Sequence, residues 1–285
     1  MTSSGVRLLY VSDLTYQARG RRYCDEDIHL SARLRPHFDL ALCHPVDAER
    51  LMSGFDVVIV RNSGPVLHYR AAHESFRKRA RAQGVRVFSE LTGRADMAGK
   101  QYLVDLFAAG YPVIPTVDDP AHRDRLPSTD EYVAKPKWGA DSIGLEFLDG
   151  QGISGLAADT TLIQPRIDFR YEVSFYFVDR SFQYALYAPD PARRWKLEPY
   201  DPTGADLVFA QRFVDWNTVD HGISRVDACR TRTGELLLVE LEDLNPYLSL
   251  DLISEEQRNT FVTAVASSIT ALARQPRSAP ADTSL

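Results

Sequence analysis

The residues of this chain best suited to metal chemistry lie at the end of one apolar run. Residues 236–239 are apolar on both faces of a predicted strand, and Glu240 and Glu242 follow directly. Side chains alternate along a strand, so both carboxylates point to the same face. Carboxylates crowded at a buried strand end repel one another, unless a cation neutralises them or some stay protonated. A hard cation such as Mg²⁺ meets this requirement, and Asn245 before Pro246 adds a neutral oxygen ligand.

A second predicted strand precedes this run, and a Thr-Arg-Thr-Gly break separates the two. If the turn is centred on residues 233–234, antiparallel pairing places Asp227 opposite Glu240. The same register places Arg225 opposite Glu242, with facing Cβ atoms about 5 Å apart. We therefore predict that three acids and an arginine share one patch. The alternative is a solvated hairpin with acidic rungs, but the apolar run before the acids argues against full exposure.

Two lysines and a glycine loop have the chemistry of a phosphate site. Lys135 lies in a short predicted strand, and a loop that contains Gly139 and Gly144 follows it. Glycines let the backbone turn sharply and bring its N–H groups, including that of Ser142, to a phosphate, while Lys135 adds a point charge. Lys100 stands in the first turn of a predicted helix, where the helix dipole disfavours a cation. That position favours a functional role over the alternative of a solvated surface charge.

The N-terminal third must supply a scaffold for these residues. Strand patterns at residues 6–12, 38–43, 57–61 and 85–88 alternate there with helical patterns at residues 25–34 and 67–82. This alternation predicts a parallel sheet covered by helices, a Rossmann-like layer without the Gly-x-Gly-x-x-Gly fingerprint of dinucleotide binding. Ligands of such sheets bind beyond the carboxyl ends of the strands. The substrate candidates are therefore Ser12, Asp13, Arg61, Asn62 and Ser63, although strand-end capping explains each of them equally well.

The later elements predict antiparallel pairing. Residues 161–167 form an apolar strand, and residues 170–187 alternate like two antiparallel strands with a turn at residues 179–180. Glu172 and Ser174 share one face of the first of these strands. The sequence thus predicts an α/β layer followed by an α+β region.

The segment from residue 189 to residue 209 is rich in Pro, Asp and Arg and is interpreted as an insertion. Arg193, Arg194 and Trp195 could clamp a substrate that bears a carboxylate, although a solvated loop is the stronger alternative. A last helix is expected at residues 255–273. Residues 275–285 have the composition of a disordered tail.

Composition limits the classes of function. The chain has 285 residues, 44% of them hydrophobic and 25% charged, as is ordinary for a globular enzyme. The net charge of −6, without a long basic stripe, argues against a nucleic-acid partner. No apolar stretch approaches the ~20 residues that span a bilayer, and residues 1–5 lead into a strand rather than a signal sequence. We therefore expect a cytoplasmic protein without a membrane partner.

Together these motifs resemble the ATP-grasp ligases. The resemblance rests on Arg225-x-Asp227, on the strand that ends in Glu240, and on the pair Asn245-Pro246. Many members have Glu-x-Asn, whereas Glu242 stands two residues after Glu240 here, so either Glu242 or Asn245 completes the metal site.

By this resemblance, Lys100 and Lys135 match the two lysines that contact the nucleotide, and the loop from Gly139 to Gly144 matches the flexible lid. The adenine pocket falls on Gln164, Pro165, Arg166 and Ile167. Asp227, Glu240, Glu242 and Asn245 would bind two Mg²⁺ ions, and Arg225 and Lys135 would be catalytic. Glu172 and Ser174 match a position where members carry Glu-x-Arg toward phosphate or acceptor, but the arginine is absent here. The substrate candidates of this region are Glu172, Ser174 and Arg193.

The resemblance also implies an architecture. Residues 1–94 would form the N-terminal Rossmann-like domain, residues 95–165 the central lid domain, and residues 166–274 a C-terminal domain with an antiparallel sheet. ATP would lie between the last two domains.

The implied activity is ATP- and Mg²⁺-dependent. A substrate carboxyl-type group is activated as an acylphosphate, and a C–N bond forms on a small amino-acid-like substrate. Among small members of the family, the chain is similar to ligases of antibiotic and amino-acid metabolism. They include an activity that cyclises O-ureido-D-serine to D-cycloserine. The alternatives are an intermolecular amino-acid ligase, a small-molecule kinase and a non-catalytic ATP-binding module. A homo-oligomer is also expected.

Overall fold

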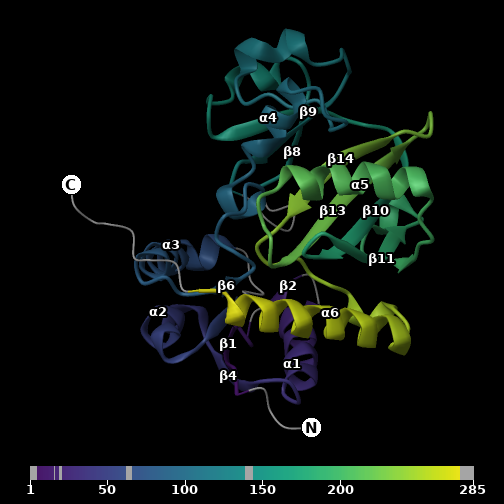
Figure 1. The fold of residues 1–285 in the computed structure, drawn as a ribbon. Coiled ribbons are helices and arrows are strands. Elements are labelled where there is room, and N and C mark those ends of the chain that lie inside the picture. The colour runs from purple at the N-terminus through teal and green to yellow at the C-terminus, as the bar shows by residue number, and fades with distance from the viewer. Residues whose placement is uncertain (1–4, 16, 19–20, 62–65, 139–143, 277–285) are drawn as a thin grey trace.

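The structure is a computed structural model that describes residues 5–15, 17–18, 21–61, 66–138 and 144–276. Four of the predicted site residues lie outside these ranges, as does most of the predicted tail. They are Asn62, Ser63, Gly139 and Ser142. The described elements form three main sheets and a short ribbon of β2 (Gln17–Ala18) and β3 (Arg21–Arg22). Figure 1 shows the parallel layer at one end of the molecule and the central unit at the other.

The N-terminal layer is a parallel sheet in the order β4-β1-β5-β6. Its strands are β1 (Arg7–Val11), β4 (Asp39–Cys43), β5 (Val57–Val60) and β6 (Val87–Phe88). The helices α1 (Tyr23–Leu34), α2 (Ala48–Leu51) and α3 (Val66–Ala82) connect them. Strands β1 and β5 are almost fully buried, as expected for a parallel sheet with helices on its faces. The predicted parallel layer is therefore present.

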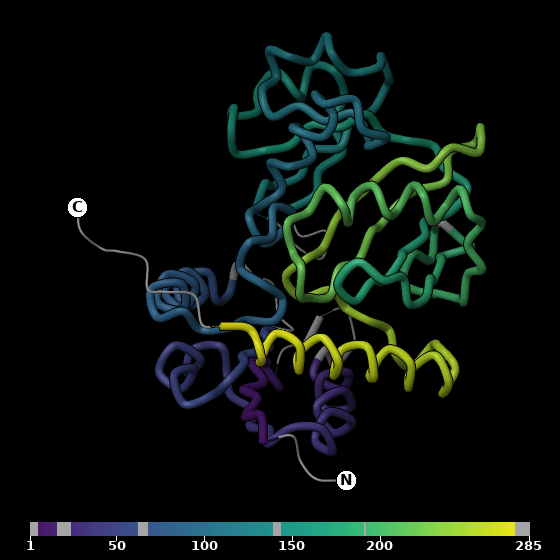
Figure 2. Tube along the Cα trace, in the orientation of Figure 1, coloured from purple at the N-terminus to yellow at the C-terminus, as the bar shows by residue number. Residues whose placement is uncertain are grey.

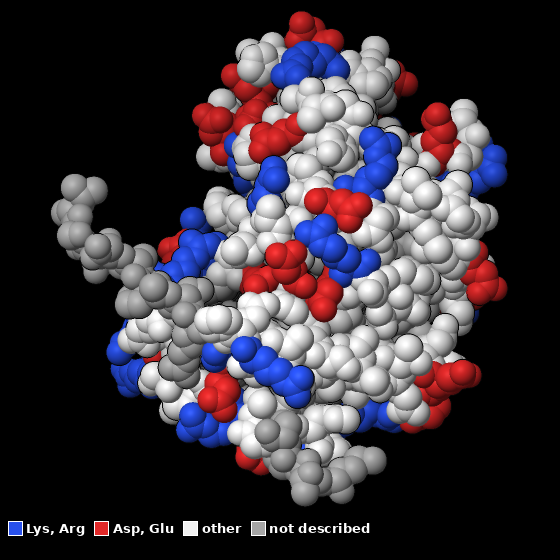
Figure 3. Space-filling view, viewed as in Figure 1, with Lys and Arg blue, Asp and Glu red and all other residues white. Residues whose placement is uncertain are grey.

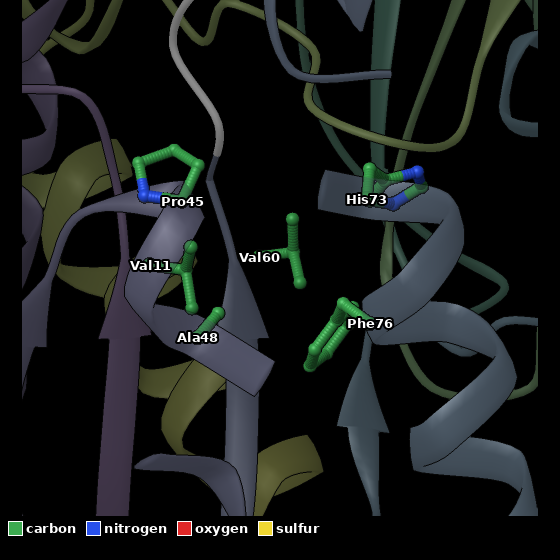
Figure 4. Close-up of a pocket in the computed structure, with 6 residues that line it drawn as sticks. All are labelled: Val11, Pro45, Ala48, Val60, His73 and Phe76. Carbon is green, nitrogen blue, oxygen red and sulfur yellow. The ribbon is translucent and has the colours of Figure 1, made fainter. Parts of the chain in front are cut away.

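A small cavity lies within this layer, between the sheet and α3 (Figure 4). It is lined by Val11, Pro45, Ala48, Val60, His73 and Phe76. His73 is 8% exposed, and its Nε2 atom has no hydrogen-bond partner among the residues that the structure describes. Burial lowers the pKa of His73 to about 4, because the charged imidazolium would lose its hydration.

The central unit is a small antiparallel sheet in the order β8-β7-β9. It consists of β7 (Tyr132–Pro136), β8 (Glu146–Leu148) and β9 (Thr161–Pro165), and α4 (Tyr102–Ala108) precedes it in the chain. An isolated bridge between Val113 and Leu238 ties the segment after α4 to the third sheet. The small sheet is thereby attached beside the strand that carries the acids.

The third sheet is antiparallel and has the order β12-β11-β10-β13-β14. Its strands are β10 (Phe169–Val178), β11 (Ser181–Ala188), β12 (Glu198–Pro199), β13 (Ile223–Thr231) and β14 (Leu236–Glu242). The helix α5 (Gly204–Trp216) packs its Phe209, Ala210 and Phe213 into a core with one face of this sheet. The expectation of an insertion across residues 189–209 is wrong for its last part, because the start of α5 lies there. A capping box between Thr203 and Asp206 starts the helix.

The helix α6 (Glu255–Arg274) returns the chain to the N-terminal layer. Its Phe261, Val265 and Ile269 share one apolar core with Tyr10 of β1 and Tyr184 of β11. Figures 1 and 2 show α6 lying between the parallel layer and the antiparallel sheet. The layer and the sheet are therefore held together by a common core.

The surface carries charges of both signs. On the face in Figure 3, acidic and basic side chains are interspersed and form no continuous basic stripe. None of the helices in the described ranges combines the length and the apolar character needed to cross a bilayer.

Candidate functional site

The acidic rungs form as predicted. Strands β13 and β14 pair with Asp227 opposite Glu240 and with Arg225 opposite Glu242. The pairing nearer the turn is one residue out of step with these rungs, since Ala228 lies opposite Leu238. A β-bulge at Asp227 and Ala228 restores the predicted register.

The bulge also explains how β14 directs its leucines to the core and its glutamates to the opposite face of the sheet. Leu238 and Leu241 are both fully buried in the core that α5 covers, although an odd spacing would put them on opposite faces. The extra residue of the bulge lets Glu240 and Glu242 turn to the other face, where both are half-buried. The carboxylates thus lie on the side of the sheet away from α5.

Arg225 holds the acidic patch together. Its Nε and Nη2 atoms donate to Asp227 at 2.9 Å each, Nη2 also donates to Glu242, and Nη1 donates to the carbonyl of Tyr247 at 2.9 Å. The hydroxyl of Ser174 donates to Asp227 at 2.6 Å. Burial raises the pKa of Glu242 to about 8 against the opposing effect of Arg225, and the neighbouring carboxylates add to the rise. Burial and the neighbouring carboxylates thus favour the protonated form of Glu242, whereas Arg225 favours its ionised form.

Lys100 lies on the same patch. Its ammonium is 2.5 Å from Glu240 Oε1, and its backbone N–H donates to the carbonyl of Lys137 at 3.0 Å. The hydroxyl of Tyr102 accepts the backbone N–H of Leu241 at 2.7 Å. Burial opposes ionisation of Glu240, but the nearby lysines hold its pKa below the usual value. The start of α4 and the end of β14 are thereby joined at the site.

Lys135 differs from Lys100 because its ammonium has no hydrogen-bond or ion-pair partner among the described residues. It projects from β7 and is half-buried. Burial, together with the positive charge of Lys100, lowers its pKa to about 8. Gly144, the first described residue after Trp138, has φ +75°, and a Cβ there would be 3.0 Å from Pro136. This geometry requires glycine at position 144.

Of the two arginines proposed from the sequence to clamp a substrate carboxylate, Arg194 contacts the site and Arg193 does not. Arg194 donates from Nε and Nη2 to the two oxygens of Glu172 at 2.6 and 2.7 Å. Arg193 instead forms an exposed pair with Asp190 at 2.7 Å. We therefore do not retain Arg193 in the site.

The substrate candidates of the N-terminal layer are engaged inside the protein. Ser12 donates to Asp27 at 2.5 Å, and Asp13 accepts the backbone N–H of Thr15 at 2.8 Å. Arg61 donates to the carbonyl of Pro246 at 2.8 Å and forms buried ion pairs with Glu26 and Asp27 at 3.1 and 3.3 Å, respectively. These contacts favour the alternative of strand-end capping. Arg61 instead links the layer to the loop that carries Asn245.

The segment predicted to contact adenine, residues 164–167, comprises the last two residues of β9 and the two residues that follow it. Gln164 is 4% exposed and donates to the hydroxyl of Thr116 at 2.8 Å. Pro165 lies opposite Tyr132 in the small sheet, and Arg166 pairs with Glu131 at the surface. Ile167 is half-buried. Since the side chain of Gln164 is already bonded, the backbone here is better placed than that side chain to contact a base.

No group of three or more His, Cys, Asp or Glu side chains within the described ranges is assembled as a metal site. The acids of the patch are paired with cations, since Lys100 contacts Glu240 and Arg225 contacts Asp227 and Glu242. The donors nevertheless fit Mg²⁺ in type, since carboxylates and an amide offer hard oxygen ligands. Asn245 is half-buried in the loop that follows the acids.

Two further acids support the site, and neither was predicted. Asp243 accepts the backbone N–H groups of Ala95 and Met97 at 3.1 and 2.8 Å, and the side-chain amide of Asn217 at 2.9 Å. Asp96 in turn accepts the backbone N–H of Asp243 at 2.7 Å. The one signal in the sequence was the acid directly after Glu242. Strand alternation carries that acid to the buried face, where it must find donors.

Solved structures with a similar fold are ATP-grasp ligases. The chain is similar to D-cycloserine synthetase DcsG, with a TM-score of 0.71 and 22% identity over 92% of this chain and 99% of that chain. The ATP-grasp ligase PsnB, complexed with a phosphomimetic variant of minimal precursor, Mg and ADP, gives a TM-score of 0.64 and 15% identity over 96% and 99%. D-alanine–D-alanine ligase from Bacillus anthracis, complexed with ATP, gives 0.62 and 11% over 95% and 96%.

These likenesses show that the chain has the ATP-grasp fold, which confirms the fold expected from the sequence. No model of a protein family matches the sequence, and no curated protein matches it.

Proposed function

We propose that this chain is an ATP- and Mg²⁺-dependent ligase that activates a carboxyl-type group as an acylphosphate and forms a C–N bond on a small amino-acid-like substrate. The observation that carries the proposal is the meeting of two lysines with three carboxylates on one face of the antiparallel sheet. Lys100 lies 2.5 Å from Glu240, and Lys135 lies near both of them without an ion-pair partner among the described residues. Such a set suits phosphoryl transfer, which depends on positioning and charge neutralisation rather than on a covalent nucleophile.

The proposed roles follow from the contacts. Lys135 binds a phosphate of ATP, because its half-buried charge has no neutralising partner among the described side chains. Lys100 holds Glu240 and lies close enough to share the same phosphate. Asp227, Glu240, Glu242 and Asn245 are the proposed ligands of two Mg²⁺ ions, which would neutralise phosphate charge when bound. The backbone of Gln164, Pro165, Arg166 and Ile167 is the proposed adenine contact. ATP would lie between the proposed domains of residues 95–165 and 166–274.

Arg225 has a narrower role than the sequence predicts. Its donors are directed to two carboxylates and a backbone carbonyl, so it orients Asp227 and Glu242. Glu172 and Ser174 remain proposed substrate-side residues, because they share the face of the sheet that carries the acids.

For the substrate we propose O-ureido-D-serine, cyclised to D-cycloserine, since the structure named D-cycloserine synthetase is similar over 99% of its length. The oxygen-bound ureido nitrogen and the activated carboxyl group then lie in one molecule, so ring closure gains the advantage of an intramolecular reaction. Nitrogen attack releases phosphate, and hydrolysis of the carbamoyl group as carbon dioxide and ammonia completes D-cycloserine. Intermolecular ligation is the second candidate, because D-alanine–D-alanine ligase is also similar. A cytoplasmic location and a homo-oligomeric state are further proposals.

Mass spectrometry of the protein with ATP, Mg²⁺ and O-ureido-D-serine tests this function. We expect ADP, phosphate and a cyclised product, without a need for a second amino acid and with discrimination against the L-isomer. A parallel incubation with D-alanine in place of O-ureido-D-serine tests the second candidate. A D-alanine dipeptide there, with no cyclised product from O-ureido-D-serine, would move the assignment to intermolecular ligation. A stable phosphorylated product without a new C–N bond would identify a kinase.

Glu240→Gln is the matched control for this experiment. It removes a charge that Lys100 and the proposed metal require, but it alters no buried apolar contact. We expect turnover to fall by at least about a hundredfold, with an unchanged circular dichroism spectrum. Full activity in this variant would contradict the proposed metal site.

A further inference from the structure

The proposed site contains two arginines in different states. Arg225 donates hydrogen bonds to Asp227, to Glu242 and to the carbonyl of Tyr247, and its side chain is 17% exposed. Arg194 contacts Glu172 with one edge of its guanidinium, and its side chain is 43% exposed. Of the two, Arg194 is therefore the one that a ligand can approach from solvent.

The pair of Arg194 and Glu172 lies at the edge of the proposed reaction site. Glu172 and Ser174 share one face of β10, and Ser174 is bonded to Asp227 of the acidic patch. Arg194 lies close enough to Lys135 for its charge to lower the pKa of that lysine. A molecule that touches this pair would thus lie beside the proposed phosphate site.

The geometry of the ion pair shows which ligand groups Arg194 and Glu172 can each bind. Two parallel N–H groups of Arg194 hold both oxygens of a carboxylate at 2.6 and 2.7 Å. This fork geometry suits a carboxylate better than a single lysine would. Glu172 presents a carboxylate that is mostly buried, with a side chain 21% exposed, and such a group needs a cationic donor whenever Arg194 leaves it.

We infer that Arg194 and Glu172 together bind the head group of a free α-amino acid, with the substrate carboxylate on Arg194 and the substrate ammonium on Glu172. The inference rests on the proposed function and narrows its substrate to a zwitterionic amino acid. Each protein charge exchanges its partner for an opposite charge of the ligand, so the net charge of the site does not change. Because Glu172 and Arg194 each keep an opposite charge in the complex, the exchange avoids the cost of an unpaired, mostly buried carboxylate.

The chain around Arg194 supports such an exchange. The segment is anchored on one side by β12, which pairs with β11 at Leu186 and Tyr187, and on the other by the capping of Ala192 by Asp190. Only the side chain of Arg194 must move, because the backbone on both sides is fixed. A peptide, whose internal residues lack the free ammonium and carboxylate, would leave both protein charges without a partner.

Calorimetry tests the inference with the full chain, Mg²⁺ and a non-hydrolysable ATP analogue. The probes are O-ureido-D-serine and D-alanine, each as the free amino acid, the carboxamide and the N-acetyl derivative. Arg194→Gln should weaken binding of the free amino acid about tenfold or more, yet leave binding of the carboxamide unchanged. Glu172→Gln should weaken binding of the free amino acid and leave that of the N-acetyl derivative unchanged.

Arg193→Gln is the matched control, because Arg193 is adjacent in the chain but paired with Asp190 at the surface. It should bind all probes as the wild type does. Equal loss of the free amino acid and its carboxamide in Arg194→Gln would overturn the inference, as would a wild type that binds neither free amino acid. In both cases, undiminished binding of the ATP analogue would leave the proposed ATP-dependent function standing.

Discussion

At the scale of single residues, Lys135 is the side chain whose state best reports on the proposed ATP site. Burial and the nearby charge of Lys100 place its pKa at about 8. Bound phosphate would stabilise the ammonium form and raise that pKa, so protonation and ATP binding favour each other.

The prediction for Lys135 concerns the pH dependence of nucleotide binding. Below pH 8 the ammonium is already formed, and the affinity for ATP should be nearly constant. Above pH 8 binding must take up a proton, so the dissociation constant should rise by up to about tenfold per pH unit. Calorimetry from pH 7 to pH 10 measures this, and Lys135→Met should bind weakly without that dependence. A wild-type affinity that is flat across this range would exclude Lys135 from the phosphate site.

His73 yields a prediction about stability rather than activity. The folded pKa of about 4 lies below the ordinary value of 6.5, so the unfolded chain binds a proton that the folded chain does not. Stability should therefore fall as the pH drops from 6.5 toward 4, by up to about 1.4 kcal/mol per pH unit. Urea unfolding at pH 7.5 and pH 5 should show a smaller loss for His73→Leu than for the wild type. Equal losses would mean that His73 is not buried in its neutral form.

At the scale of elements, the acidic hairpin shows what strand alternation can and cannot predict. The rungs of Asp227 with Glu240 and of Arg225 with Glu242 were predicted from an assumed turn at residues 233–234. Near the turn the real register differs by one residue, and the bulge at Asp227 compensates for the difference. A bulge depends on the competing demands of the core and the site, so it has no sequence signature of its own.

The helix α5 was missed for a different reason. The preceding segment is rich in Pro, Asp and Arg, and that composition hid the capping box of Thr203 and Asp206. The sequence does contain a helix-start pattern here. A Thr stands three residues before an acid, and apolar residues with helical spacing follow at Leu207, Phe209, Ala210 and Phe213. Contacts between side chains that are far apart in the sequence could not be predicted from it. Arg61 was expected at a substrate but contacts Pro246, and Arg194 rather than Arg193 reaches Glu172.

The capping box gives a prediction for α5. The Thr203 hydroxyl accepts the Asp206 N–H at 3.2 Å, so Thr203→Ala should lower the free energy of unfolding by about 1 kcal/mol. The kcat should not change, because α5 covers the face of the sheet away from the acids. Thr203→Ser, which keeps the hydroxyl, should restore stability in urea unfolding. A drop in kcat without a loss of stability would contradict this account of α5.

At the scale of the whole molecule, the site depends on three units held in contact. Arg61 of the parallel layer donates to the carbonyl of Pro246, and Arg225 of the antiparallel sheet donates to that of Tyr247. Tyr102 of α4 accepts the N–H of Leu241. The parallel layer and the antiparallel strands were readable from the sequence, apart from α5, whereas these contacts depend on how the units pack together. The ATP-grasp fold accounts for the arrangement, and the proposed chemistry accounts for the cations and acids that meet within it.

The most direct test of that chemistry follows the oxygen atoms of the substrate. If a carboxylate is activated as an acylphosphate, one of its oxygens leaves with the phosphate when nitrogen attacks. O-Ureido-D-serine labelled with ¹⁸O in its carboxylate, and D-alanine labelled in the same way, should be incubated with ATP, Mg²⁺ and the protein. We predict one ¹⁸O atom in the released inorganic phosphate by mass spectrometry. Phosphate that is released at the same rate but carries no ¹⁸O would contradict the account, because ATP would then be hydrolysed without activation of the substrate carboxylate.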